Sequence, residues 1–274
     1  MKTRKGYKVY PLTAAQKLHF YYQQYCPKKQ VLNIGSYLAI QVELDFGLLK
    51  ESVYEAYARC DSMRLRFAKD KDGTTYQYVV KKEERDIEFF DFTGWKPEDA
   101  KHQMDLWTEI PFEKYDSPQN RVVMIKLPDG FQGLYIVVDH MTMDAQALIP
   151  FFKDIIEIYS YKKYTDAGLS YPKEMASYIK QLQKDLDYEA GTPAKDRDTK
   201  FFEQLISSSE PIFTDINGPE RLQQEREKEN DPNLRAVTIV SDNVDSNLST
   251  FHLESEPSAR LMQFCEDHQI SMTC

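Results

Sequence analysis

The chain has 274 residues, of which 41% are hydrophobic and 13% aromatic, a composition typical of globular rather than disordered proteins. Its formal net charge of −9 at pH 7 argues against a nucleic-acid partner, because phosphate binding needs a basic face. The four cysteines form no CxxC pair, which argues against a zinc site or a disulfide framework. Because the sequence contains no apolar signal core and no run of membrane-spanning length, we expect a cytoplasmic protein that binds no membrane.

The first half of the sequence alternates predicted helices and strands. Thr13 can cap a helix over residues 14–25, because Gln16 lies three residues later and completes a capping box. The following pattern predicts a strand at 33–44, a helix from Asp45 to Cys60, a hairpin over 63–80 with its turn at Asp72-Gly73, a strand at 87–92 and a helix from Pro97 to Thr108.

Two strands are predicted on either side of Pro128-Asp129-Gly130. The second, Leu134 to Val138, is apolar at every position, so both of its faces should be covered and it should lie centrally in a sheet. A long helix from Asp144 follows. Its apolar residues at core spacing are Leu148, Phe151, Phe152, Ile155 and Tyr159.

After Tyr161 the apolar patterning weakens. We expect helices near 174–187 and 200–207, a charged mobile loop at 214–235, strands at 236–241 and 249–255, and a helix from Pro257. Strands and helices with both α/β and antiparallel connections predict an α/β sandwich forming one lobe. The end of the sequence directly after the last helix suggests an incomplete protein.

His140 is the main candidate for chemistry. It follows the central strand at its carboxyl end, where open α/β sheets gather ligands and catalytic groups. A partly desolvated imidazole there can accept a proton from an amine or hydroxyl near neutral pH. The local pattern fits equally well a histidine that packs and hydrogen-bonds at the end of a strand.

Two aspartates flank His140. Asp144 lies where a helix N-cap is expected, and spacing alone favours that role, although its second oxygen could also neutralise a buried arginine. Asp139 should point to the opposite side of the strand from His140. This orientation favours a structural hydrogen-bonding group over a second catalytic residue.

Arg64 and Arg66 share one face of the strand that begins the hairpin. If that face is buried, the arginines need carboxylate partners, and we predict Asp144 as the partner of Arg64. The alternative is an exposed strand with alternating charge.

The sequence carries no GxSxG, P-loop or Rossmann glycine pattern. The remaining histidines show no metal-ligand spacing with carboxylates or thiols, so we predict no metal site and interpret each as a surface or core residue. They are His19, His102, His252 and His268.

Several stretches, taken in chain order, resemble motifs of one family. The stretches are YPLTAAQKLHFYY, which contains S/T-x-AQ; RCDSMRLRF, which resembles RHExLRTxF with Arg59, Asp61, Arg64 and Phe67 in register; IPFEKYDSPQNRVVMIKL; VVDHMTMDAQALIPFFKDIIEIY, which resembles HHxxxDG; and DTKFFEQL and SARLMQFCEDHQISMTC. The chain resembles the N-terminal lobe of a condensation domain of nonribosomal peptide synthetases. These domains belong to the chloramphenicol-acetyltransferase-like, CoA-dependent acyltransferase superfamily.

The resemblance implies roles residue by residue. His140 matches the catalytic second histidine, and Asp144 matches the aspartate that holds the loop through a salt bridge to an arginine. Arg64 matches the arginine of the second motif. Two positions depart from the pattern: Asp139 stands where the first, generally structural, histidine is usual, and Ala145 stands where glycine is usual.

The family fold has two similar lobes with the active-site tunnel between them. The resemblance therefore implies an N-terminal lobe at 1–161, closing helices, a charged loop and strands of the same domain at 162–256, and the start of a second lobe at 257–274. It also implies amide-bond formation between acyl and aminoacyl thioesters on the phosphopantetheine arms of carrier proteins, or on CoA, without a permanently bound cofactor. Without the C-terminal lobe, the chain alone should be inactive.

Two other functions stay open at this point. One is a free-standing acyltransferase that uses acyl-CoA or an acyl-carrier thioester with a soluble amine or alcohol. The other is a catalytically silent lobe that docks carrier proteins, and the motivation for it is the unusual residue Asp139.

Overall fold

The computed structural model describes residues 3–82, 85–207, 219–233 and 252–271, and the chain divides into the units Met1–Asp242 and Asn243–Cys274. In the second unit the described helix is α8 (Ser255–His268). In the first unit the α-helices are α1 (Ala14–Tyr25), α2 (Phe46–Arg59), α3 (Pro97–Glu109), α4 (Ala145–Lys163), α5 (Tyr178–Ala190), α6 (Pro193–Ser207) and α7 (Pro219–Lys228), with short 3-10 turns η1 (Lys29–Leu32), η2 (Ser62–Arg64) and η3 (Thr165–Ala167).

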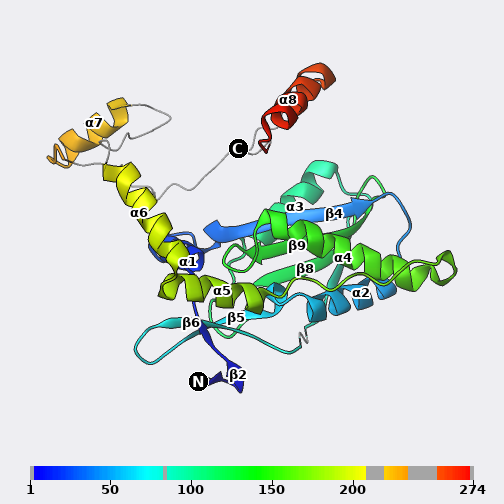
Figure 1. The fold of residues 1–274 in the computed structure, drawn as a ribbon. Helices are drawn as coiled ribbons and strands as arrows, with labels where there is room; N and C mark the ends of the chain where they lie inside the picture. Colours follow the sequence, from blue (N-terminus) through cyan, green and yellow to red (C-terminus); the bar gives the residue numbers. More distant parts are fainter. Residues whose placement is uncertain (1–2, 83–84, 208–218, 234–251, 272–274) are drawn as a thin grey trace. The chain divides into compact units, whose positions relative to one another are not determined.

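A four-stranded sheet forms the centre of the first unit (Figure 1). Its strands, in spatial order, are β4 (Asn33–Ile40), β9 (Gln132–Asp139), β8 (Asn120–Lys126) and β7 (Glu88–Asp91). β7 pairs with β8 in parallel and the other neighbours are antiparallel, so the sheet is mixed. Every residue of β9 is buried, which confirms the prediction of a central strand covered on both faces.

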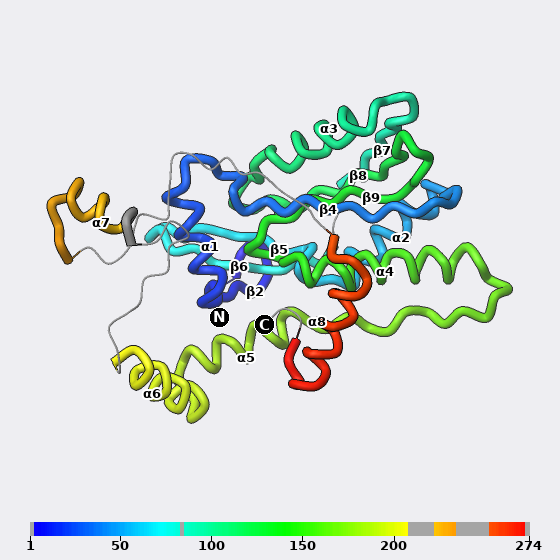
Figure 2. The backbone as a smooth tube through the Cα atoms, turned by 90° about the horizontal axis from the view of Figure 1, so that it is seen from above, coloured from blue at the N-terminus to red at the C-terminus, as the bar shows by residue number. Residues whose placement is uncertain are grey.

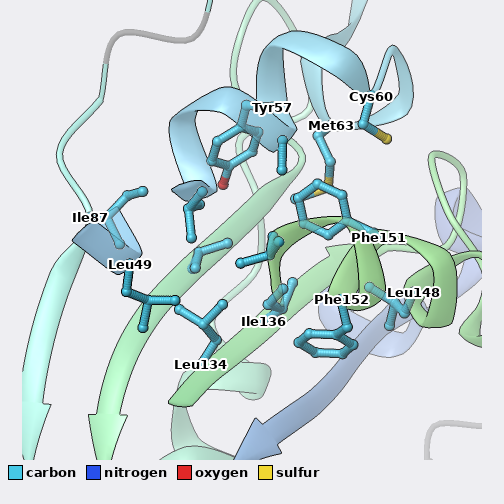
Figure 3. Close-up of a cluster of buried hydrophobic side chains, with 14 of the residues drawn as sticks. Leu49, Tyr57, Cys60, Met63, Ile87, Leu134, Ile136, Leu148, Phe151 and Phe152 are labelled. Atoms are coloured by element: carbon cyan, nitrogen blue, oxygen red, sulfur yellow. The ribbon is translucent and has the colours of Figure 1, made fainter. Parts of the chain in front are cut away.

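Helices cover both faces of this sheet. α2 and α4 lie on one face and α3 on the other, as the two views in Figures 1 and 2 agree. Alternate residues of β9 belong to the two cores: Leu134 and Ile136 pack with α2 and α4, whereas Tyr135 and Val137 pack with α3. Figure 3 shows the first of these cores, where side chains of α2 and α4 meet the sheet.

A smaller sheet lies beside α1. It consists of β3 (Tyr10–Pro11), β6 (Thr75–Val79) and β5 (Leu65–Lys69), and a further pair joins β1 (Thr3–Arg4) to β2 (Tyr7–Lys8). A third hydrophobic core lies here, and its buried members include Leu65, Phe67 and Met141. Met141 follows His140, so this core anchors the loop that carries the candidate histidine.

Local sequence signals account for most element boundaries. Thr13 and Gln16 form the predicted capping box of α1, and Asp45 caps α2. Gly73, at φ 90°, occupies the predicted turn between β5 and β6. The strand predicted at 33–44 is shorter in the structure, because β4 ends at Ile40. Ile40 pairs with Gln132, the first residue of β9, so the partner strand does not extend to residues 41–44.

Predictions for the last third of the sequence need correction where the structure describes it. The segment 214–235 contains α7 rather than only a loop; its glutamine, glutamate, arginine and lysine residues favour helix, and Gln223 bonds Glu227 one turn later at 2.8 Å. The strand predicted at 236–241 lies outside the described residues. The one predicted at 249–255 is not a strand where it is described, at 252–255, and Ser255 begins α8 two residues before Pro257. In the described part of the chain, no helix is long and apolar enough to cross a bilayer.

Candidate active site

His140 lies in the short loop between β9 and α4. The loop crosses from the end of the central strand to the helix, and the His140 backbone N–H donates to the carbonyl of Leu32 at 2.9 Å. The His140 side chain is half-buried. The imidazole is therefore held at the carboxyl end of β9, where partial exposure leaves it accessible to a small reacting group.

Asp139 organises the loop from inside. Its side chain is 1% exposed, and Oδ1 accepts a hydrogen bond from the Met141 backbone N–H at 2.8 Å. The Asp139 carbonyl accepts from both the N–H and the hydroxyl of Thr142, each at 2.8 Å. These bonds close a tight turn around His140 and fix the path of its backbone.

The second carboxylate oxygen of Asp139 faces a cation. Lys114 Nζ, from the segment between α3 and β8, lies 3.4 Å from Oδ2, and the lysine side chain is only 16% exposed. Burial lowers the pKa of Lys114, and the nearby Asp139 charge opposes that shift. The charge that Asp139 introduces in place of the usual histidine is thus compensated by a buried ion pair.

One face of α1 contacts the loop at three residues, which are spaced by three and four positions along the helix. Gln16 Nε2 donates to the Met141 carbonyl at 3.0 Å, and Gln23 Nε2 lies 3.4 Å from Asp139 Oδ2. Between them, the His19 ring lies against the His140 ring, with centroids 4.4 Å apart and planes inclined by 30°. Positions 16, 19 and 23 share one helix face, so α1 presents a polar row to the loop.

His19 and Lys114 therefore contact the candidate loop, and neither is a candidate by sequence pattern alone. A signal existed for α1, because Gln16, His19 and Gln23 recur at helical spacing on a face that is otherwise used for packing. For Lys114 the signal was weaker: a buried aspartate requires a cation, but the sequence does not show which one.

Gln16 also anchors α1 to the smaller sheet. The amides of Gln16 and Gln77 bond each other reciprocally at 2.9 and 2.7 Å, and Tyr178 donates to Gln77 Oε1 at 2.6 Å. Burial raises the pKa of Tyr178 to about 12, so its hydroxyl keeps the proton that it donates. This buried network connects the first motif to the loop of His140.

The predicted salt bridge between Arg64 and Asp144 is wrong. Arg64 is buried, which excludes the alternative of an exposed strand, but its guanidinium pairs with Asp61 at 2.9 Å and donates to the carbonyls of Tyr57 and Val80 at 2.8 and 2.6 Å. Asp144 is exposed and accepts from the Ala147 N–H at 2.7 Å as the N-cap of α4. Asp61 lies only three residues from Arg64, so the local carboxylate meets the need that we assigned to Asp144.

Another ion pair joins the second motif to α4. Arg59 at the end of α2 bonds both oxygens of Asp154, with Nε–Oδ2 and Nη2–Oδ1 distances of 2.9 Å. The same guanidinium donates to the carbonyl of Pro172 at 3.2 Å. Asp154 is buried in α4, on the same helix face as Phe151 and Ile155. A carboxylate on the apolar face of a helix indicates a buried ion pair, although it does not show which cation is the partner.

Replacing Asp144 by alanine is expected to lower the free energy of unfolding by about 1 kcal/mol, the typical contribution of an N-cap. Asp45→Ala is the matched control, because Asp45 caps α2 through the Leu48 N–H at 3.0 Å. Urea unfolding of both variants measures the effect. If Asp144→Ala alone lowered the free energy of unfolding by several kcal/mol, this would contradict a simple cap and indicate that Asp144 pairs with a buried charge.

A cavity of about 820 Å³ lies between α4 and the segment 169–176. Its lining includes Cys60, Met143 and Asp154 but not His140. Burial raises the pKa of the Cys60 thiol, which keeps it protonated and makes it a poor nucleophile. The cavity therefore offers no activated thiol, and His140, in the loop after β9, is the candidate group for proton transfer.

Comparison with known proteins relates this geometry to a family. A family model described as Condensation domain matches residues 7–273. Surfactin synthase subunit 1 of Bacillus subtilis (strain 168) is 25% identical over 208 residues, which cover 73% of this chain and 6% of that protein. The starter condensation domain of rhizomide synthetase RzmA superimposes with a TM-score of 0.64 at 19% identity, covering 74% of this chain and 49% of that one. A variant of it in complex with C8-CoA gives 0.63 at 19% identity, covering 74% and 46%.

The chain thus spans about half the length of these solved structures and a small part of the synthase subunit. The shared fold confirms the predicted chloramphenicol-acetyltransferase-like α/β lobe with a mixed sheet. Since the match extends over nearly the whole sequence and includes the loop of His140, the chain belongs to the condensation domain family.

Proposed function

We propose that this chain supplies the His140-bearing lobe of a condensation domain that joins an acyl thioester to an acceptor amine. One observation carries the proposal: in a chain of this family, a half-buried His140 lies at the carboxyl end of β9, in a turn held by Asp139. The first domain segment, 1–161, would form this lobe, 162–256 would complete it, and 257–274 would begin a second lobe.

His140 would act on the acceptor amine. As the amine nitrogen attacks the thioester carbonyl, a C–N bond forms, the C–S bond breaks, and the imidazole takes a proton from the amine. The departing thiolate then recovers a proton from the imidazolium. A positioned base contributes about 10²–10⁴-fold, and holding both thioester arms close together supplies much of the remaining acceleration.

The substrates would be thioesters on the phosphopantetheine arms of carrier proteins or on CoA. A solved neighbour of the same fold is described in complex with C8-CoA, which supports an acyl thioester as the donor. A second lobe would provide the opposite wall of the tunnel; the chain's coverage of about half of that neighbour supports this partner. No permanently bound cofactor takes part in the reaction.

The alternative of a silent docking lobe rested on Asp139. The Asp139 carboxylate is paired with Lys114 and accepts a hydrogen bond from the Met141 N–H. An aspartate at this position therefore leaves no unpaired charge in the turn, which supports a catalytic His140 over a silent docking lobe.

The test is a condensation assay with the protein that contains this lobe together with its second lobe. A donor carrier loaded with an acyl thioester is mixed with an acceptor carrier loaded with an aminoacyl thioester, and mass spectrometry follows the acceptor arm. We expect the acyl group to appear on the acceptor amine, and the 274-residue chain alone to give no product.

Two controls separate the alternatives. An acceptor whose amine is acetylated should remain unchanged, and acyl-CoA in place of the donor carrier identifies which thioester is accepted. Transfer to a soluble amine but not to a loaded acceptor would favour a free-standing acyltransferase. Intact carrier binding without any transfer would favour the docking lobe and refute the proposed reaction.

A further inference from the structure

The pair formed by His19 and His140 joins two distant parts of the sequence. His19 lies on the face of α1 that contacts the loop of His140, and its side chain is half-buried. Its ring centroid is 4.4 Å from that of His140, and the planes are inclined by 30°, which is close contact between the two ring faces. Helical spacing places His19 on the polar row of α1, but the ring contact itself depends on how α1 packs against the loop after β9.

The surroundings hold His19 firmly in this place. Three residues before it, Gln16 bonds the Met141 carbonyl at 3.0 Å, and four residues after it, Gln23 bonds the Lys29 carbonyl at 2.7 Å. The helix is therefore fixed on both sides of His19, and the loop is fixed at both neighbours of His140. The backbone positions that carry the two rings are therefore fixed relative to each other.

Burial and the neighbouring His140 lower the pKa of His19. Burial is the main cause that lowers the pKa of His19, proximity to His140 lowers it further, and Asp139 opposes these effects. The Asp139 carboxylate is itself shared with Lys114, whose ammonium lies 3.4 Å away. At neutral pH His19 is thus an uncharged ring, and placing a proton on both imidazoles at once is unfavourable.

We propose that His19 is a positioning residue for His140: its neutral imidazole packs against the catalytic ring at a tilt, fixes the orientation of that ring and disfavours a second positive charge on the pair. This inference rests on the proposed function, in which His140 accepts the proton of the acceptor amine. Holding the ring in a productive orientation matters because misplacement of a catalytic group by about 1 Å can cost about 10²-fold in rate.

The ring contact is tested first without substrate. NMR titration of the 274-residue chain, labelled at histidine, is expected to give a pKa of His19 below the ordinary imidazole range. His140→Phe keeps a ring in contact but removes the charge, so the pKa of His19 should rise. His102→Phe, on the exposed side of α3, is the control and should leave it unchanged. An identical His19 titration in wild type and His140→Phe would overturn the pairing.

The positioning role is tested by activity in the complete condensation protein. His19→Ala removes the ring contact and is expected to lower kcat by about 10- to 100-fold with little change in KM for the loaded carriers. His19→Phe preserves a flat ring against His140 and should restore most of kcat, while His102→Ala should resemble wild type.

Unchanged kcat in His19→Ala, or equal losses in His19→Ala and His19→Phe, would overturn the positioning role. Circular dichroism and thermal unfolding of each variant identify loss of fold, and His19→Phe, which keeps the side-chain volume, carries the comparison if His19→Ala unfolds. Absence of turnover in wild type would refute the proposed function instead, and the substrate-free titration would still decide whether the two rings act as a pair.

Discussion

Replacing His140 by alanine is expected to lower the rate of condensation by about 10²–10⁴-fold, the range lost with a positioned general base. The fold should remain intact, because the loop is held by backbone bonds and by Asp139 rather than by the imidazole. The assay with loaded donor and acceptor carriers measures the rate, and urea unfolding measures stability. Carrier binding should be preserved, so the loss should appear in kcat.

His102→Ala on α3 is the matched control for removing a histidine, since His102 is exposed and lies in another part of the fold. Near-normal turnover by His140→Ala would refute the catalytic assignment. A variant that loses both activity and stability would need His140→Gln, which keeps the approximate size of the side chain, before the loss could be assigned to chemistry.

Replacing Asp139 by asparagine is expected to lower the free energy of unfolding by about 3–5 kcal/mol, because it leaves the buried ammonium of Lys114 without its anion. The asparagine retains an oxygen that can accept from the Met141 N–H, so the substitution removes the charge while the geometry of the turn is kept. Urea unfolding at pH 7 measures the loss. Lys114→Met added to Asp139→Asn removes the unpaired charge and should recover most of the stability.

The effect should depend on pH in a defined direction. The pKa of Lys114 is lowered in the folded chain, mainly by burial, so above that pKa the unfolded chain binds more protons and stability rises with pH. Asp139→Asn removes the opposing influence of the carboxylate, which lowers the pKa of Lys114 further. The variant should therefore regain stability as pH rises towards the ordinary lysine value of 10.5, starting at a lower pH than wild type. A loss that is constant with pH, or that Lys114→Met does not rescue, would contradict the ion pair.

The local elements were largely predictable because their causes are local. A capping box begins α1, aspartates cap α2 and α4, and Gly73 supplies the left-handed turn of the hairpin. The same reasoning missed α7, because a low apolar content suggested a loop while favourable helix propensities and a bond between Gln223 and Glu227 stabilise a helix.

The partners of charged groups were predicted less well. The sequence left open whether Arg64 is buried; it is buried, and Asp61 rather than Asp144 meets its charge. A buried arginine needs a carboxylate partner, but the sequence contains several carboxylates that could fill this role. Their distances from the guanidinium depend on how η2 and the hairpin pack, which no residue pattern records.

By itself, the sequence determined the family, the succession of helices and strands, the central strand β9 and the placement of His140 at its end, because motifs, caps and apolar runs act over short stretches. Only the tertiary structure decided what surrounds that histidine. The Asp139–Lys114 pair joins residues 25 positions apart, and the His19–His140 contact needs α1 packed against the loop after β9. Such contacts depend on the three-dimensional packing of separate elements, and that packing brings Asp139 and His19 together around His140.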